Sequence, residues 1–146
     1  VIQNVFDLLE MRASKKHITL TFDNKYAKPI WIIGDQEKVQ QVVTNLVVNS
    51  IKYGKEGGTT EVGIEDLVNN KVIIRITDNG EGIEKQHIPR LFERFYRVDK
   101  GRSRKIGGTG LGLAIVKNAV LLHKGTISAK SVSTGGLSFI FSLRKY

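Results

Sequence analysis

The chain contains no cysteine among its 146 residues. A disulfide framework and a metal site built on thiolates are therefore both excluded. No apolar run approaches the ~20 residues that a membrane-spanning helix requires. The first residues lack the basic segment of a signal peptide, and no initiator Met is present. We therefore expect a piece of a longer chain.

Acidic residues are fewer than basic ones, 14 against 23, which gives a net charge of +9. Such an excess indicates an anionic partner. Nucleic acid is one candidate, but the aromatic residues are few and are not interleaved with the basic ones. The densest basic run, residues 100–105, lies directly before a glycine cluster, where a small polyphosphate would fit equally well. Charge alone leaves both partners open.

The length and an ordinary composition, 40% hydrophobic and 25% charged, predict a single domain over residues 1–146. Apolar residues at helical spacing predict helices over 2–13 and 36–53, the second with Asp35 as its N-cap. An apolar helix is expected to follow the glycine cluster and to end before Gly125. Alternating apolar residues predict strands over 17–22, 30–33, 60–67, 71–77, 126–132 and 137–143.

A further short helix is expected after residue 83, with Pro89 in its first turn. Its apolar side chains would be Ile88, Leu91, Phe92 and Phe95.

The stretch Asp78-Asn79-Gly80-Glu81-Gly82-Ile83 begins where the apolar alternation of the strand over 71–77 ends. Glycines leave no side chain in the way of a flat ligand, and a buried carboxylate requires a hydrogen-bonding partner such as an amine. Asp-Asn-Gly is also a strong turn signal by itself. The stretch therefore fits either a ligand site or a plain strand-to-loop turn.

Three polar residues, Asn45, Asn49 and Lys52, lie along one side of the helix over 36–53. Two amide carbonyls and an ammonium in line could hold a cation and a phosphate. A solvated helix face explains the same pattern.

Residues 107–113, Gly-Gly-Thr-Gly-Leu-Gly-Leu, open the third long helix. Backbone N–H groups and the helix dipole make such a start favourable for phosphate. The dinucleotide pattern G-x-G-x-x-G fails because Leu113 occupies its last glycine, and the P-loop ending Gly-Lys-Ser/Thr is absent.

Four elements thus follow one another in a fixed order: Asn45…Asn49…Lys52-Tyr53, residues 78–82, residues 91–97 and residues 107–113. This order resembles the N, G1, F and G2 boxes of the ATP-binding catalytic domain of bacterial sensor histidine kinases, members of the GHKL superfamily. The resemblance covers about residues 35–143 and extends weakly back to residue 2. It implies the Bergerat fold, an α/β (α+β) two-layer sandwich: a mixed β-sheet with helices on one face and a flexible ATP lid at about 98–107.

The resemblance also implies roles for single residues at the adenine end. Asp78 looks like the acid that accepts the adenine amino hydrogen. Gly80 and Gly82 would let the base approach the backbone, with Ile83 beside it, and Tyr53 would flank the nucleotide. Ser50 stands where the family usually has Ala, a change expected to be harmless.

At the phosphate end, the resemblance makes Asn49 the Mg²⁺ ligand, supported by Asn45, and gives Lys52 a phosphate contact. Asn45, Asn49 and Lys52 would thus form the catalytic group. Arg97 would be a further phosphate or lid contact. The phosphates would lie on the backbone N–H groups of the last box, at Gly108, Thr109, Gly110, Leu111 and Gly112.

The implied function is to bind Mg-ATP and to present its γ-phosphoryl group to a histidine on a separate dimerisation helix of a two-component sensor kinase. The family's acceptor motif is a His followed by an acid, then Arg or Lys, then Thr-Pro. None of His17, His87 and His123 matches it, and each is expected to be an ordinary surface or boundary histidine. The chain alone is therefore expected to be monomeric and not to autophosphorylate. By resemblance, the parent is a homodimeric membrane sensor with a cytosolic catalytic end and a response regulator as partner.

Three alternatives remain at this point. Another GHKL function, such as an anti-sigma-type serine kinase or a DNA-linked ATPase, is disfavoured by the F-like stretch, which the other branches lack. A nucleic-acid binder would show steeply salt-dependent affinity, but it leaves the four-box order unexplained, so no nucleic-acid partner is expected. A pseudokinase that binds ATP only to signal stays open.

Overall fold

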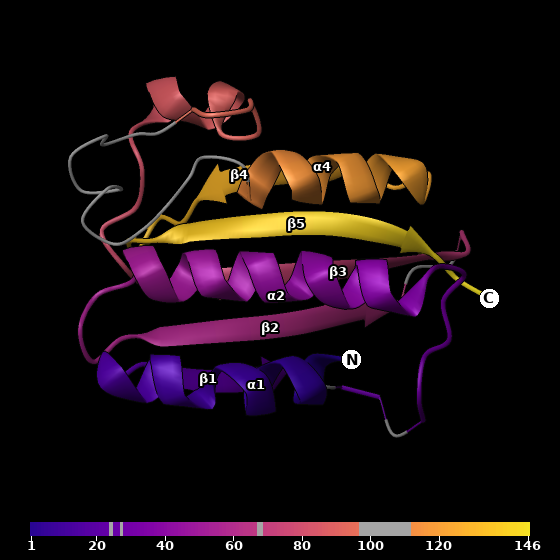
Figure 1. Cartoon of the computed structure of the whole chain (residues 1–146), viewed down its shortest axis with the longest axis horizontal. Coiled ribbons are helices and arrows are strands. Elements are labelled where there is room, and N and C mark those ends of the chain that lie inside the picture. The colour runs from indigo at the N-terminus through magenta and orange to yellow at the C-terminus, as the bar shows by residue number, and fades with distance from the viewer. Residues whose placement is uncertain (24, 27, 67–68, 97–111) are drawn as a thin grey trace.

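The computed structural model describes residues 1–23, 25–26, 28–66, 69–96 and 112–146. Its helices and strands are, in chain order, α1 (Ile2–Lys15), β1 (Thr19–Asp23), α2 (Gln36–Tyr53), β2 (Thr59–Asp66), β3 (Lys71–Asp78), the 3₁₀-helix η1 (Lys85–Arg90), α4 (Gly112–Leu122), β4 (Ile127–Ser131) and β5 (Leu137–Arg144). The five strands form one mixed sheet in the order β1-β2-β3-β5-β4. The pair β1 and β2 is parallel and the other pairs are antiparallel. The predicted mixed sheet is confirmed (Figure 1).

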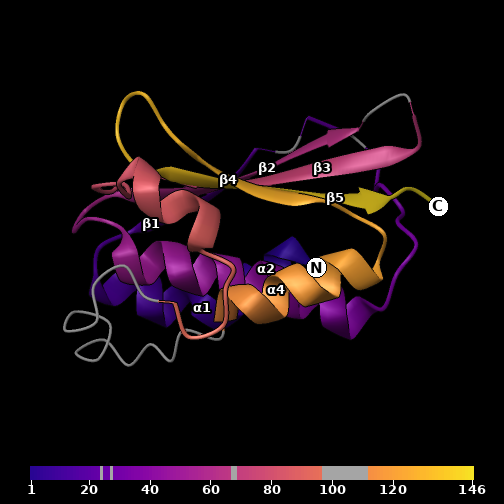
Figure 2. The same cartoon turned by 90° about the horizontal axis from the view of Figure 1, so that it is seen from above.

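The helices α1, α2 and α4 all lie on one side of the sheet (Figure 2). Alternation along β3 and β5 turns large apolar side chains toward these helices, among them Ile76, Phe139 and Phe141, each at most 1% exposed. The facing stripe of α2 is buried from Val39 to Ser50 at the predicted spacing. The two-layer arrangement expected from the sequence is therefore present. No helix in the described part of the chain is long and apolar enough to cross a lipid bilayer.

Helix α2 begins and ends where the sequence predicts. The Asp35 carboxylate accepts hydrogen bonds from the backbone N–H groups of Glu37 and Lys38, at 3.0 and 3.4 Å, as an N-cap does. Gly54 ends the helix in an extended conformation, with φ −70° and ψ 163°.

Helices α2 and α4 run antiparallel, because the C-terminal end of α4 meets the N-terminal end of α2. His123 Nε2 accepts a hydrogen bond from the Asp35 backbone N–H at 3.0 Å, while Nδ1 lies 2.8 Å from the Ala119 carbonyl. A Cβ at Gly34 would come within 2.7 Å of the His123 ring, so a larger residue there would require the ring to shift away from Asp35. The other ends of the two helices, the C-terminus of α2 and the N-terminus of α4, consequently lie at the same end of the molecule (Figure 1).

Two sequence predictions about short elements are wrong. Residues 30–33 do not form a strand; Ile32 makes an isolated bridge with Lys145, flanked by two backbone hydrogen bonds, from Ile33 N–H to the Arg144 carbonyl and from Tyr146 N–H to the Trp31 carbonyl. The short helix over 85–90 is a 3₁₀-helix with Pro89 as its next-to-last residue rather than in its first turn. Proline lacks an N–H and clashes with the carbonyl four residues earlier, so an α-helix does not form there. Phe95, expected on its apolar side, is 62% exposed and has φ 64°.

Candidate functional site

Asp78 is the last residue of β3 and is only 8% exposed, although it is acidic. Its Oδ1 accepts a hydrogen bond from the Gly80 backbone N–H at 2.9 Å, and the Leu137 N–H also donates to the carboxylate. Burial raises the pKa of Asp78 above its ordinary value, while these two hydrogen bonds oppose the rise. A carboxylate held in this way has acceptor capacity left for a ligand amine.

Glycines bring three backbone segments together around Asp78. A Cβ at Gly80 would lie 3.0 Å from the Tyr53 carbonyl and 3.1 Å from Gly54 Cα, so the loop after β3 packs against the end of α2. A Cβ at Gly136, in the turn between β4 and β5, would lie 2.0 Å from the Asp78 carbonyl oxygen. Gly82 has φ 79° and faces the same turn, where its Cβ would lie 3.2 Å from the Gly136 carbonyl.

A buried polar pair links α2 to the strand beside Asp78. Thr60 of β2 is the register partner of Asp78 and is fully buried. Its hydroxyl lies 2.7 Å from that of Ser50 on α2. Ser50, which we expected to be a harmless replacement of Ala, therefore satisfies a buried hydroxyl that Ala would leave without this partner.

The residue that follows Asp78 also has a structural role. The Asn79 side-chain oxygen accepts a hydrogen bond from the Thr59 backbone N–H at 2.8 Å, which closes the start of β2 onto the end of β3. Sequence reasoning missed the structural roles of Thr60, Asn79 and Gly136. Only their contacts with residues distant along the chain reveal them.

Asn45, Asn49 and Lys52 lie on α2 as predicted, and each is half-buried. Within the described part of the chain, neither Asn45 nor Asn49 makes a side-chain hydrogen bond, so their amide oxygens stay available to a ligand. Tyr53 closes the helix, and Ile83 packs against the apolar core.

Of the residues after α2 that were assigned to the phosphates, Gly112 is the first residue of α4 and is exposed. The other five, Arg97, Gly108, Thr109, Gly110 and Leu111, lie outside the described residues, as does the expected lid.

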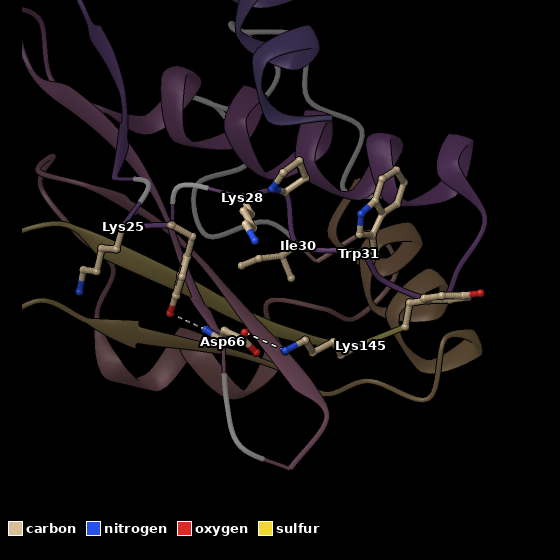
Figure 3. A pocket seen from close by; sticks show the side chains of 9 residues that line it. Lys25, Lys28, Ile30, Trp31, Asp66 and Lys145 are labelled. Atoms are coloured by element: carbon tan, nitrogen blue, oxygen red, sulfur yellow. Dashed lines mark hydrogen bonds and ion pairs between the residues drawn. The ribbon is translucent and has the colours of Figure 1, made fainter.

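A separate hollow of about 520 Å³ lies at the other end of the sheet (Figure 3). Lys145 Nζ forms an ion pair with Asp66 Oδ2 at 2.8 Å, and the Tyr26 hydroxyl accepts a hydrogen bond from the Asp66 N–H. Asp66 and Asp78 lie at opposite ends of the paired strands β2 and β3, so this hollow is distinct from the site around Asp78. Trp31, on its rim, is 72% exposed.

The fold and the site together define a class of protein: nucleotide-binding domains in which a mixed sheet carries helices on one face and a buried acid ends a central strand. Comparison with known proteins agrees. Residues 34–146 match the family described as histidine kinase-, DNA gyrase B- and HSP90-like ATPases. The chain belongs to this family.

Two similar relatives are sensor kinases named WalK. The chain is 39% identical over 140 residues to the sensor histidine kinase WalK of Bacillus subtilis strain 168, covering 95% of the chain and 23% of the relative. It is 44% identical over 117 residues to the sensor protein kinase WalK of Staphylococcus aureus, covering 80% of the chain and 28% of the relative. The chain thus spans about a quarter of the length of these curated relatives.

Solved structures of histidine kinases share the fold. The catalytic domain of histidine kinase ThkA superposes with a TM-score of 0.82 at 28% identity, covering 99% of this chain and 90% of that one. The mycobacterial sensor histidine kinase MprB gives a TM-score of 0.82 at 30% identity, covering 98% and 95%. ThkA has also been solved in complex with the response regulator protein TrrA, and that structure matches at 25% identity with a TM-score of 0.81, covering 99% of this chain and 39% of that one.

Proposed function

We propose that this chain binds Mg-ATP between α2, the end of β3 and the start of α4, and presents the γ-phosphoryl group to a histidine on a separate helix of a two-component sensor kinase. The observation that carries the proposal is Asp78: a buried carboxylate at a strand end, with glycines that let three backbone segments pack closely around it. Membership in an ATPase family supports it.

At the adenine end, Asp78 accepts a hydrogen bond from the exocyclic amine of the base. Gly80 and Gly82 let the base approach the backbone, and the absence of a side chain at Gly80 also lets this loop pack against the end of α2. Ile83 and Tyr53 supply apolar surface on either side. A guanine presents a carbonyl where adenine has its amine, so the carboxylate disfavours GTP.

At the phosphate end, Asn49 supplies an amide oxygen to Mg²⁺ and Asn45 supports it. An uncommitted amide oxygen fits Mg²⁺, a hard cation that takes its other ligands from water and the nucleotide phosphates. The bound ion would neutralise charge on the phosphates during transfer. Lys52, the N-terminus of α4 at Gly112, and the residues proposed on sequence grounds, Arg97 and 108–111, bind the phosphate oxygens.

The phosphoryl acceptor lies on another part of the parent protein. Each histidine of this chain has a partner: His17 pairs with Glu56, His87 with the Tyr96 hydroxyl, and His123 with the start of α2. We propose that acceptor helices of the parent homodimer dock beside the nucleotide, that a response regulator receives the phosphoryl group in turn, and that this part of the parent lies in the cytosol. The complex of ThkA with TrrA supports such a partner.

Calorimetric titration tests the nucleotide site. Mg-ATP is expected to bind saturably and in preference to GTP. The Asp78→Asn variant should lose most of this affinity, at least about tenfold, because its amide presents an N–H₂ or a weaker acceptor to the adenine amine. Asp23→Asn is the matched control: Asp23 also ends a strand, β1, but is exposed, and the affinity should not change.

Equal ATP affinity of the native chain and Asp78→Asn would show that the adenine site lies elsewhere. Tight binding of a DNA duplex that weakens steeply with salt, together with indifference to ATP, would instead favour the nucleic-acid alternative.

A further inference from the structure

A lysine outside the proposed site holds the end of helix α2. Lys16 follows the last residue of α1, and its Nζ lies 3.0 Å from the Ile51 carbonyl oxygen and 2.9 Å from those of Lys52 and Gly54. An ammonium group has three protons, and here each has an acceptor. The last four carbonyls of an α-helix have no partner within the helix, so Lys16 satisfies groups that would otherwise need water.

The backbone around Lys16 fixes the same loop a second time. The Lys16 carbonyl accepts a hydrogen bond from the Gly57 N–H at 3.0 Å, and the Thr19 N–H donates to the Gly58 carbonyl at 3.0 Å. The segment between α1 and β1 is thus bonded along the loop that joins α2 to β2. The ammonium of Lys16 binds the start of this connection, at Gly54 and the last turn of α2, and the two backbone bonds hold its end, at Gly57 and Gly58.

This connection forms part of the wall of the proposed nucleotide site. Lys52 and Tyr53 belong to the last turn of α2, and Gly54 Cα would lie 3.1 Å from a Cβ on Gly80. A displacement of the last turn by a fraction of an ångström would therefore reach Gly80 and the Asp78 carboxylate bonded to it.

Charge points in the same direction. The C-terminus of a helix carries a partial negative charge, and the C-terminus of α2 packs on the Gly80 loop beside Asp78, which is itself acidic. The Lys16 ammonium lies on the carbonyls that generate this charge, and it offsets them without itself occupying the ligand site.

We propose that Lys16 is a positioning residue for nucleotide binding: it fixes the last turn of α2, with Lys52, Tyr53 and Gly54, in the arrangement that Gly80 and Asp78 require, and it offsets the partial negative charge of that helix end. The inference rests on the proposed function of the Asp78 site. Lys16 acts through these residues and does not contact the nucleotide.

The test compares Lys16→Met with Lys15→Met. Lys15 carries the same charge one residue earlier but is exposed. For each variant, the dissociation constant for Mg-ATP is measured by calorimetry and the unfolding transition in urea is measured separately, so that affinity is compared under conditions where both variants are folded. Lys16→Met is expected to bind Mg-ATP about tenfold more weakly, the change that corresponds to about 1.4 kcal/mol, and Lys15→Met to bind it within about twofold of the native chain.

Three results would overturn the inference. If Lys16→Met has a lower urea midpoint than the native chain but the same affinity for Mg-ATP, Lys16 is a purely structural helix cap. Equal weakening by Lys15→Met would reduce the effect to the net charge of the surface. Failure of the native chain itself to bind ATP would remove the proposed function along with it.

Lys16→Arg keeps the inference testable if Lys16→Met does not fold. It retains the charge and most of the side-chain length, but a planar guanidinium does not direct three donors at three converging carbonyls as an ammonium does. Lys16→Arg should bind Mg-ATP about threefold more weakly than the native chain. Where Lys16→Met folds, Lys16→Arg should bind Mg-ATP more tightly than that variant. Where Lys16→Met does not fold, native affinity in Lys16→Arg would contradict the proposal.

Discussion

At the scale of single residues, the burial of the Asp78 carboxyl lowers the stability of the unliganded fold. Burial raises the pKa of its carboxyl above the ordinary value of 3.8. Between that value and the raised one, the folded chain binds the proton more tightly than the unfolded chain does. Stability contributed by the protonated form is therefore lost as the pH rises through the raised pKa. Burial of this carboxyl therefore lowers the stability of the unliganded fold once the pH exceeds its ordinary pKa.

This linkage predicts how Asp78→Asn changes stability with pH. The free energy of unfolding of the native chain, relative to that of Asp78→Asn, should fall as the pH is raised from about 4 toward neutrality, and then stay constant above the raised pKa. Urea unfolding at a series of pH values measures the difference. Asp23→Asn, at an exposed strand end, should not reproduce the trend. Parallel curves for the native chain and Asp78→Asn would show that the carboxyl titrates alike in the folded and unfolded states.

At the scale of elements, the turn between β4 and β5 places its backbone against the end of β3. Gly136 has φ 101°, and a Cβ there would lie 2.0 Å from the Asp78 carbonyl oxygen. Gly57 has a comparable positive φ of 73°, but a Cβ there meets nothing within 4 Å. Substitution of Gly57 would therefore introduce backbone strain alone, whereas substitution of Gly136 would introduce both strain and steric overlap with β3.

Gly57→Ala is expected to cost about 1 kcal/mol of stability, the strain of a left-handed alanine alone. Gly136→Ala should cost about 3 kcal/mol, because overlap with β3 adds to the strain, and it should also weaken Mg-ATP binding by moving Asp78. Denaturant unfolding and calorimetry measure the two effects. Equal stability losses in both variants would mean that the turn gives way without disturbing Asp78.

Elements with a local signal could be predicted from the sequence. Asp35, the apolar stripe to Ser50 and Gly54 define α2 by themselves, and the alternation from Lys71 to Thr77 places Asp78 at a strand end. The segment 30–33 has the same apolar character, but whether it forms a strand depends on how far it pairs with the residues after β5. The Ser50–Thr60 pair, the approach of Gly136 to Asp78 and the three carbonyls bonded by Lys16 join residues distant along the chain, and no local pattern encodes them.

At the scale of the whole molecule, α2 and α4 are joined at one end by His123, and the other ends of both helices carry residues assigned to the proposed ligand. With acceptor helices bearing a kinase phosphoacceptor histidine supplied in trans, the chain is expected to transfer the γ-phosphoryl group of ATP to that histidine. The chain alone should not label itself. Asn49→Ala should lower the transfer rate by at least about tenfold, through loss of a Mg²⁺ ligand.

The chemistry of the label separates the alternatives. Radiolabelled ATP should give a product that is labile to acid and stable to base, as a phosphohistidine is. An acid-stable phosphoester on a hydroxyl would indicate the serine-kinase alternative, and nucleotide binding without any transfer would indicate a pseudokinase.

The exposed indole at the far end of the sheet has an optical consequence. Trp31 is the only tryptophan in the chain, and it lies beside the Asp66–Lys145 ion pair, at the opposite end of β2 and β3 from Asp78. Its fluorescence therefore belongs to one known position that the proposed nucleotide does not touch. Because Trp31 is already 72% exposed, its emission is expected to stay unchanged when ATP binds at the Asp78 site, and a change on adding ATP would indicate a second ligand at the far end of the sheet.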